Sequence, residues 1–378
     1  MIKRQLEAQV ALDLQEKMVL VGGPRQSGKT TLAQIFGPKE AYLNWDDPRD
    51  RARFLKLDLP PTDIWIFDEI HKYKQWRNHL KGLYDKYRKE KQILVTGSAR
   101  LDLLRRGGDS LQGRYHFLRL YPLTLDELGK GAGQSDLEQL FNLSGFPEPF
   151  LSGSSRKSQR WSHQYRQRVL EEDISSVETI DDLGKAELLL LHLPERVGSP
   201  LSVNSLREDL GVSHRTASRW LQLFERFYAL FTLKSFAARG LRALKKERKH
   251  YHFDWTLIED QGARFECLVA NHLLKLVHFR VDSEGRSMEL SYFRDTAKRE
   301  VDFTVTEKGR PILFVEAKLS DSEINPHLRY LKRKFPSTPA FQVHLKGKKD
   351  FIDAQDNIRV LPARKFLHEV SLLLDQGS

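Results

Sequence analysis

The most informative stretch of this chain is Gly23-Pro24-Arg25-Gln26-Ser27-Gly28-Lys29-Thr30. It matches the phosphate-binding P-loop pattern G-x-x-x-x-G-K-[ST] at every fixed position. The apolar run before it, residues 18–21, predicts a buried strand, and residues 31–36 after it predict the first turns of a helix. Because backbone N–H groups of such a loop bind phosphates, we expect these eight residues and Thr31 to contact a nucleoside triphosphate.

A second stretch, Ile64-Trp65-Ile66-Phe67-Asp68-Glu69, predicts an apolar strand that ends in two carboxylates. Lys29 would reach the β- and γ-phosphates, and the Thr30 hydroxyl and Asp68 would hold Mg²⁺. Glu69 would polarise the attacking water. A plain strand end is the alternative for this stretch alone, but the P-loop upstream favours Mg²⁺-dependent hydrolysis. We expect ATP and Mg²⁺ as cofactors, although no motif distinguishes ATP from GTP.

The middle of the chain predicts a helix–turn–helix over residues 202–221. Gly211 lies at the turn, and Ser213 caps the second helix, whose apolar positions are Ala217, Trp220, Leu221 and Phe224. The basic segment 239–249 follows where the wing of a winged helix would lie. We expect DNA contacts from His214, Arg215, Ser218, Arg219, Arg239, Arg242, Lys245 and Lys246. The alternative is a lid or a protein-contact domain.

The C-terminal part predicts an apolar helix over residues 262–277 with Glu266, and a hairpin of strands 300–305 and 312–318. The hairpin would bring Asp302 beside Glu316, with Lys318 on the same strand face as Glu316. Glu266, Asp302 and Glu316 would bind Mg²⁺, and Lys318 would orient the attacking water. This pattern resembles the restriction-endonuclease-like site, PD-(D/E)xK. A solvated hairpin and a non-cleaving binding platform are the alternatives.

Composition narrows the class of protein. The chain has 378 residues, 40% of them hydrophobic, and a net charge of +11, which favours an acidic polymer such as nucleic acid as partner. Cys267 is its one cysteine, so internal disulfides and cysteine-based zinc sites are excluded. No run is apolar and long enough for a membrane helix, and the first residues lack a secretory h-region. We therefore expect a cytoplasmic protein without a membrane partner.

The chain resembles bacterial and archaeal ATPases that join an AAA-type P-loop domain to a C-terminal restriction-endonuclease-like domain of unknown function. The residues that carry the resemblance are 23–30, 64–69, 96–98, 113–114 and 145–149. The family usually shows two glycines before the proline of the last element, and here the second is Phe146.

The resemblance implies further roles. In AAA-type ATPases a polar residue at the end of the corresponding strand helps to position the attacking water. Here that strand is expected over residues 92–100, and Thr96 and Ser98 are both candidates. Arg114 is either a finger that reaches the γ-phosphate of a neighbouring subunit or a surface arginine. A finger acting on a neighbour implies a homo-oligomer, and the family favours a hexameric ring.

We therefore predict an α/β protein of four parts. They are an AAA-type P-loop ATPase domain (1–128), a helical linker region (129–190), a winged-helix domain (191–252) and a restriction-endonuclease-like domain (253–378). The predicted function is ATP hydrolysis that acts on DNA, coupled to the winged helix and to a metal-dependent nuclease-like domain. The alternative is a regulatory switch that docks a protein partner, with a non-cleaving C-terminal domain. A weaker possibility is a nuclease effector gated by ATP.

Overall fold

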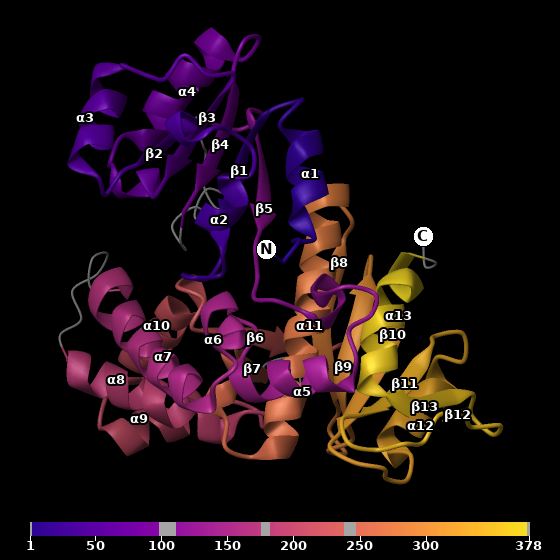
Figure 1. Cartoon of the computed structure of the whole chain (residues 1–378). Helices are drawn as coiled ribbons and strands as arrows, with labels where there is room; N and C mark the ends of the chain where they lie inside the picture. The colour runs from indigo at the N-terminus through magenta and orange to yellow at the C-terminus, as the bar shows by residue number, and fades with distance from the viewer. Residues whose placement is uncertain (1, 98–110, 175–181, 238–246, 376–378) are drawn as a thin grey trace. The chain divides into compact units, whose positions relative to one another are not determined.

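The computed structural model describes residues 2–97, 111–174, 182–237 and 247–375 (Figure 1). The chain divides into two units: residues 1–123 with 226–228 and 282–284, and the remainder. Ser98, Arg239, Arg242, Lys245 and Lys246, all predicted site residues, lie outside the described ranges.

The first unit contains a parallel sheet. Its elements are α1 (Leu6–Asp13), β1 (Met18–Gly22), α2 (Lys29–Ala33), η1 (Lys39–Ala41), β2 (Tyr42–Asn44), α3 (Pro48–Lys56), β3 (Ile64–Asp68), η2 (Ile70–Lys72), α4 (Trp76–Tyr87), β4 (Gln92–Thr96) and β5 (Tyr115–Arg119). The strand order is β2-β3-β4-β1-β5, and all neighbouring strands are parallel. Every residue of β1 and β3 is buried, as expected for parallel strands that are covered on both faces.

The order of the strands brings three predicted site segments together. β4 lies between β1 and β3, and Thr96 at its end is in register with Val21 on one side and with Asp68 on the other. Parallel strands end at the same edge of a sheet, so the P-loop after β1 lies at the edge where β3 delivers Asp68. The predicted strand–loop–helix arrangement is confirmed.

The second unit begins with helices. They are η4 (Leu125–Leu128), α5 (Gln134–Leu143), α6 (Pro147–Ser152), α7 (Ser155–Arg168), the π-helical η5 (Val169–Ile174), α8 (Leu183–His192), η6 (Leu193–Arg196), α9 (Val203–Leu210) and α10 (His214–Arg226). An antiparallel hairpin, β6 (Leu230–Lys234) and β7 (Arg248–His252), follows α10. Gly211 has a φ of 61° at the turn between α9 and α10, and the Ser213 hydroxyl accepts a hydrogen bond from the amide of Thr216. The predicted pair of helices is therefore present.

The same unit ends in a mixed sheet. Its elements are η7 (Trp255–Leu257), α11 (Gln261–Glu284), β8 (Met288–Arg294), β9 (Glu300–Glu307), β10 (Arg310–Lys318), α12 (Pro326–Lys334), β11 (Ala340–His344), β12 (Phe351–Ile352), β13 (Ile358–Pro362) and α13 (Ala363–Asp375). The strand order is β12-β13-β11-β10-β9-β8. Ala340 packs with α12 in one apolar cluster, whereas the ring of Phe341 contacts Phe366 of α13. Because consecutive strand residues face opposite ways, α12 and α13 cover opposite faces of the sheet.

The predicted hairpin of the C-terminal part is formed by β9 and β10. Lys308 and Gly309 make its two-residue turn, both with positive φ, as a hairpin that matches strand twist requires. On the other side of β9, Thr304 pairs with Ser291 and Val301 with Phe293, so β9 contains one extra residue here. This β-bulge lies between Val301 and Thr304, in the stretch of β9 that contains Asp302.

Candidate functional site

The P-loop runs from the end of β1 into α2 in a backbone shape that depends on glycine. Gly23 has a φ of 138°, and a Cβ at this position would lie 2.2 Å from the carbonyl oxygen of Leu120. Gly28 has a φ of 96° directly before α2. These two conformations explain why the fixed glycines of the pattern are needed here.

Lys29 is the buried cation of the loop. Its Nζ donates to the carbonyl oxygens of Pro24 at 2.6 Å and Gly23 at 3.1 Å. The ammonium therefore lies inside the curve of the loop, where the loop amides would bind phosphates. Among the other predicted loop contacts, Ser27 is buried, whereas Thr30 and Thr31 are exposed on α2.

Asp68 is held by three neutral hydroxyl groups. Its Oδ2 accepts hydrogen bonds from Thr30 Oγ1 at 2.7 Å and from the Tyr42 hydroxyl at 2.6 Å. Its Oδ1 accepts from Thr96 Oγ1 at 2.5 Å. Burial and the neighbouring Asp68 raise the pKa of the Tyr42 hydroxyl, which keeps it a donor. Hydroxyl donors fix the carboxylate without cancelling its charge.

Thr30 and Asp68 fit a magnesium ion. A threonine hydroxyl and a carboxylate in direct contact, both oxygen donors beside a phosphate-binding loop, are the ligands that Mg²⁺ uses in P-loop enzymes. When bound with a nucleotide, the ion would neutralise charge on the β- and γ-phosphates. Asp68 is only 4% exposed, so its charge is poorly screened by water and available to such an ion.

Glu69 directly follows β3 with a φ of 57°, in the left-handed region that non-glycine residues seldom adopt. Its Oε2 lies 3.6 Å from both Lys72 Nζ and His71 Nε2. Burial raises the pKa of Glu69, the Lys29 ammonium lowers it, and the Asp68 carboxylate raises it. A carboxylate with a raised pKa next to a phosphate-binding loop suits a group that accepts a proton from water.

Thr96 and Arg114 are placed differently by the structure. Thr96 contacts Asp68, as described above. Arg114 directly precedes β5, at the edge of the sheet opposite to the P-loop, and its guanidinium pairs with Asp85 of α4 at 2.7 Å. Arg114 therefore does not serve the P-loop of its own chain, and its role toward a neighbouring subunit stays a prediction.

Two residues near the loop were missed by sequence reasoning. Tyr42 comes from the short edge strand β2, and Arg4 precedes α1. Arg4 is buried, and its guanidinium donates to the carbonyl oxygens of Ser27 at 2.7 Å and Tyr121 at 2.5 Å. Arg4 thus supports the P-loop although it belongs to no motif, and no pattern in a single sequence identifies it.

The predicted DNA-contacting face of α10 is accessible. His214, Arg215 and Arg219 are exposed and Ser218 is half-buried, with its hydroxyl 3.4 Å from His214 Nδ1. The predicted apolar face of this helix, Ala217, Trp220, Leu221 and Phe224, is buried. Lys249, the last residue of the predicted basic wing segment, is instead fully buried.

Four predicted residues of the C-terminal part gather around β9 and β10. Glu316 Oε1 accepts from Lys318 Nζ and from Asn325 Nδ2, both at 2.5 Å, and its Oε2 accepts from the amide of Asp302 at 3.3 Å. Asp302 Oδ2 accepts from the amide of Ala317 at 2.9 Å. The predicted neighbourhood of Asp302 and Glu316 is therefore present, with Lys318 paired to Glu316.

Glu266 of α11 joins the same group through Lys249 of β7. Lys249 Nζ lies 2.6 Å from Glu300, 3.3 Å from Glu266 and 4.0 Å from Asp302. Burial lowers the pKa of Lys249, but Glu266, Asp302 and Glu300 raise it above its ordinary value, so the amine stays protonated. Burial and then Glu316 and Glu266 raise the pKa of Asp302 well above its usual range.

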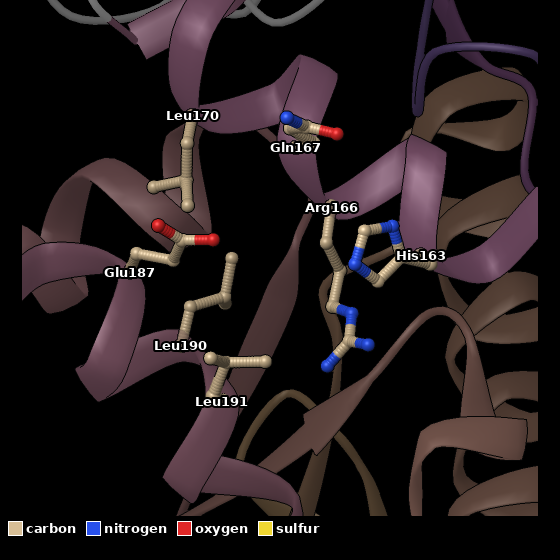
Figure 2. Close-up of a pocket in the computed structure, with 7 residues that line it drawn as sticks. All are labelled: His163, Arg166, Gln167, Leu170, Glu187, Leu190 and Leu191. Atoms are coloured by element: carbon tan, nitrogen blue, oxygen red, sulfur yellow. The ribbon is translucent and has the colours of Figure 1, made fainter. Parts of the chain in front are cut away.

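The carboxylates of this group do not fit Mg²⁺ as the chain is folded. An ammonium lies among them, and the described ranges contain no group of three or more His, Cys, Asp or Glu side chains arranged to hold a metal ion. A separate small hollow lies between α7, η5 and α8 (Figure 2). None of the predicted site residues lines it, and we assign it no function.

Three family models match successive parts of the chain. Residues 15–129 match the family model described as AAA domain. This part is an AAA-type P-loop ATPase domain. Residues 134–260 and 261–366 match two domains of unknown function, DUF8612 and DUF4143. These boundaries do not test the predicted winged helix or the predicted nuclease-like domain.

The chain also has relatives that match over most of its length and whose names give no role. An uncharacterized protein of Mycobacterium tuberculosis is 26% identical over 335 residues, which cover 82% of this chain and 73% of the relative. An uncharacterized protein of Haemophilus influenzae is 24% identical over 335 residues, 79% of this chain and 81% of the relative.

Solved structures are more distant. The Walker-type ATPase PABY2304 of Pyrococcus abyssi aligns with a TM-score of 0.41 at 12% identity, over 70% of this chain and 96% of that one. The Aeropyrum pernix ORC1 protein in complex with DNA aligns with a TM-score of 0.35 at 14% identity, over 72% and 94%. At these scores neither likeness carries an argument. None of the helices in the described residues is long and apolar enough to span a lipid bilayer.

Proposed function

We propose that this chain hydrolyses ATP with Mg²⁺ and that its ATP cycle acts on DNA. The observation that carries the hydrolytic part is Asp68, whose carboxylate is fixed by Thr30, Tyr42 and Thr96 from three different elements. A carboxylate oriented in this way, in contact with the Thr30 hydroxyl of the P-loop, supports metal-assisted phosphoryl transfer.

Each residue at the P-loop end of the parallel sheet would have its own part in ATP hydrolysis. Lys29 and the loop amides would bind the phosphates, Thr30 and Asp68 would hold Mg²⁺, and Thr96 would keep Asp68 in place. Glu69 would accept a hydrogen bond from the attacking water and take its proton. Mg²⁺, when bound, would offset the negative charge of the β- and γ-phosphates.

DNA contact is supported by the surface of α10 and by the charge of the chain. His214, Arg215 and Arg219 are exposed on a helix that follows a tight turn, and an antiparallel hairpin comes next. This order of elements supports a winged helix whose second helix reaches DNA phosphates and bases. The net charge of +11 favours the same partner. We further propose that Arg114 completes the site of a second copy, which requires a homo-oligomer.

The second candidate function is a switch that docks a protein partner and does not cut DNA. The observation that favours it is the ion pairing of Lys249 within the C-terminal carboxylates, because a cleaving site needs those acids for a metal. In that case the C-terminal part has a restriction-endonuclease-like arrangement without its chemistry, which the fold alone permits.

The test is ATP hydrolysis by the full chain, with and without single-stranded, duplex and branched DNA, at low and moderate salt. We expect stimulation by one DNA form, weakening as salt rises because phosphate contacts release counterions. The double variant Arg215→Ala/Arg219→Ala should lose the stimulation and keep basal turnover. Arg156→Ala, an exposed arginine on α7, is the matched control. Basal turnover without stimulation by any DNA would favour the protein-directed switch.

A further inference from the structure

We propose that Lys249 is the resident cation of the C-terminal carboxylate cluster, here defined as Glu266, Glu300, Asp302 and Glu316. The ammonium takes the place that a divalent metal would need, so the cluster does not bind Mg²⁺ while β7 is in its present position. This inference concerns the C-terminal part alone and does not depend on ATP hydrolysis.

The first argument is the position of the Lys249 side chain. It is 1% exposed, and Nζ makes close contacts with Glu300 and Glu266 and a longer one with Asp302. The same ammonium lies 5.4 Å from the centre of the Tyr292 ring, whose π-face favours a cation. A buried ammonium requires paired carboxylates, and this one has several, so it is a built part of the cluster.

Strand β7 positions Lys249 in the cluster. Lys249 and Tyr251 are two apart on β7, so their side chains leave the strand on the same face. The Tyr251 hydroxyl donates to Glu266 Oε1 at 2.7 Å, the same oxygen that Lys249 approaches. The backbone of β7 is fixed by regular pairing with β6, and the amide of Leu201 donates to the carbonyl of Arg248 at 2.7 Å. One strand thus inserts two donors into the cluster.

The other acids of the cluster also accept from groups of the protein besides Lys249. Glu316 is bound by Lys318, Asn325 and the amide of Asp302, and Asp302 by the amide of Ala317. Glu300 forms an ion pair with a second cation, Arg294, at 2.7 Å. Mg²⁺ prefers several oxygen ligands with free lone pairs in an octahedral arrangement. Each of the four carboxylates thus accepts at least one hydrogen bond or ion pair from the chain, and the ammonium of Lys249 lies among them.

Lys249 belongs to β7, so the position of this strand places the ammonium among the acids. Lys249 and a divalent cation therefore compete for the same acids. Metal binding at this cluster requires that Lys249 leave it. While β7 holds Lys249 there, the cluster does not bind a metal.

The experiment measures Mn²⁺ binding by calorimetry to the full chain without nucleotide, in wild type, Glu316→Gln and Lys249→Met. Methionine keeps the length and apolar stem of lysine and removes its charge. We expect no saturable Mn²⁺ binding that depends on Glu316 in wild type, and the gain of one saturable site in Lys249→Met. This site should be lost in the double variant Lys249→Met/Glu316→Gln. Lys334→Met, an exposed lysine on α12, should behave as wild type.

Two results would overturn the inference. One is Mn²⁺ binding by wild type that disappears in Glu316→Gln, because the cluster would then hold a metal with Lys249 present. The other is a Lys249→Met variant with wild-type circular dichroism that binds no Mn²⁺, because Lys249 would then not be what excludes the metal. If Lys249→Met does not fold, the comparison of Mn²⁺ binding between wild type and Glu316→Gln still tests whether the cluster holds a metal with Lys249 present.

Discussion

The two carboxylate sites of this chain differ in the kind of donor that their acids accept from. Asp68 accepts hydrogen bonds from three neutral hydroxyls, which orient the carboxylate and leave its negative charge in place. The C-terminal carboxylates are paired with the ammonium groups of Lys249 and Lys318 and with Arg294. On our proposals, acids at suitable spacing do not by themselves make a metal site, because the charge of their partners also matters.

The largest expected effect is at the P-loop lysine. Lys29→Ala should abolish ATP turnover, because removing a group that stabilises phosphate charge costs at least about 10²–10³-fold in rate. Nucleotide binding, followed by fluorescence of a labelled ATP analogue, should be lost as well. Lys39→Ala, an exposed lysine in η1, should leave both unchanged. Wild-type ATP turnover in Lys29→Ala would contradict the assignment of the P-loop as the ATPase site.

The next effect is at the proposed base. Glu69→Gln should keep nucleotide binding and lower turnover by about 10²–10⁴-fold, the usual contribution of a positioned general base. The measurement is single-turnover hydrolysis of radiolabelled ATP beside a binding titration. Glu40→Gln, an exposed acid in η1, serves as the matched control. Retained turnover in Glu69→Gln would mean that another group activates the water.

A smaller effect is expected from the hydroxyl that sequence reasoning missed. Tyr42→Phe removes one of the three donors to Asp68 and should weaken the apparent Mg²⁺ affinity of the ATPase by about tenfold, as outer-shell changes do. Mg²⁺ titration of turnover at saturating ATP measures this. Tyr73→Phe, whose hydroxyl donates to the exposed Gln75 side chain at 3.3 Å, is the control. An unchanged Mg²⁺ dependence would show that Thr30 and Thr96 orient Asp68 without Tyr42.

The smallest effect separates the two sites. Glu316→Gln alters the C-terminal cluster but not the parallel sheet, so basal ATP turnover should equal that of wild type. A steady-state assay at several ATP concentrations checks this, with circular dichroism as a test of folding. A large fall in turnover in a folded variant would contradict the separation of the two sites.

The contiguous motifs of the nucleotide site were predictable from the sequence, because each motif encodes a strand and the turn that follows it. The P-loop and the Asp68–Glu69 strand end are of this kind, and the pairing of Asp302 with Glu316 followed from a short hairpin. Thr96 was one of two candidates, since strand-end position alone does not choose a hydroxyl.

Contacts made by residues outside these motifs were not predictable. Arg4 reaches the P-loop and Tyr42 reaches Asp68 from elements that carry no pattern. Lys249 belongs to a basic segment that predicted exposure to DNA, and the fold buries it among acids instead. Charge composition indicates how many cations a segment has, but only packing determines which of them pair inside the protein.

The most direct test of the account counts bound metal in the wild-type chain by electron paramagnetic resonance of Mn²⁺, with and without a non-hydrolysable ATP analogue. The account predicts one bound Mn²⁺ per chain when the analogue is present and none that depends on Glu316 when it is absent. The nucleotide-dependent ion should disappear in Lys29→Ala. Bound Mn²⁺ without nucleotide that is lost in Glu316→Gln would contradict it, because the carboxylates around Lys249 would then hold a metal of their own.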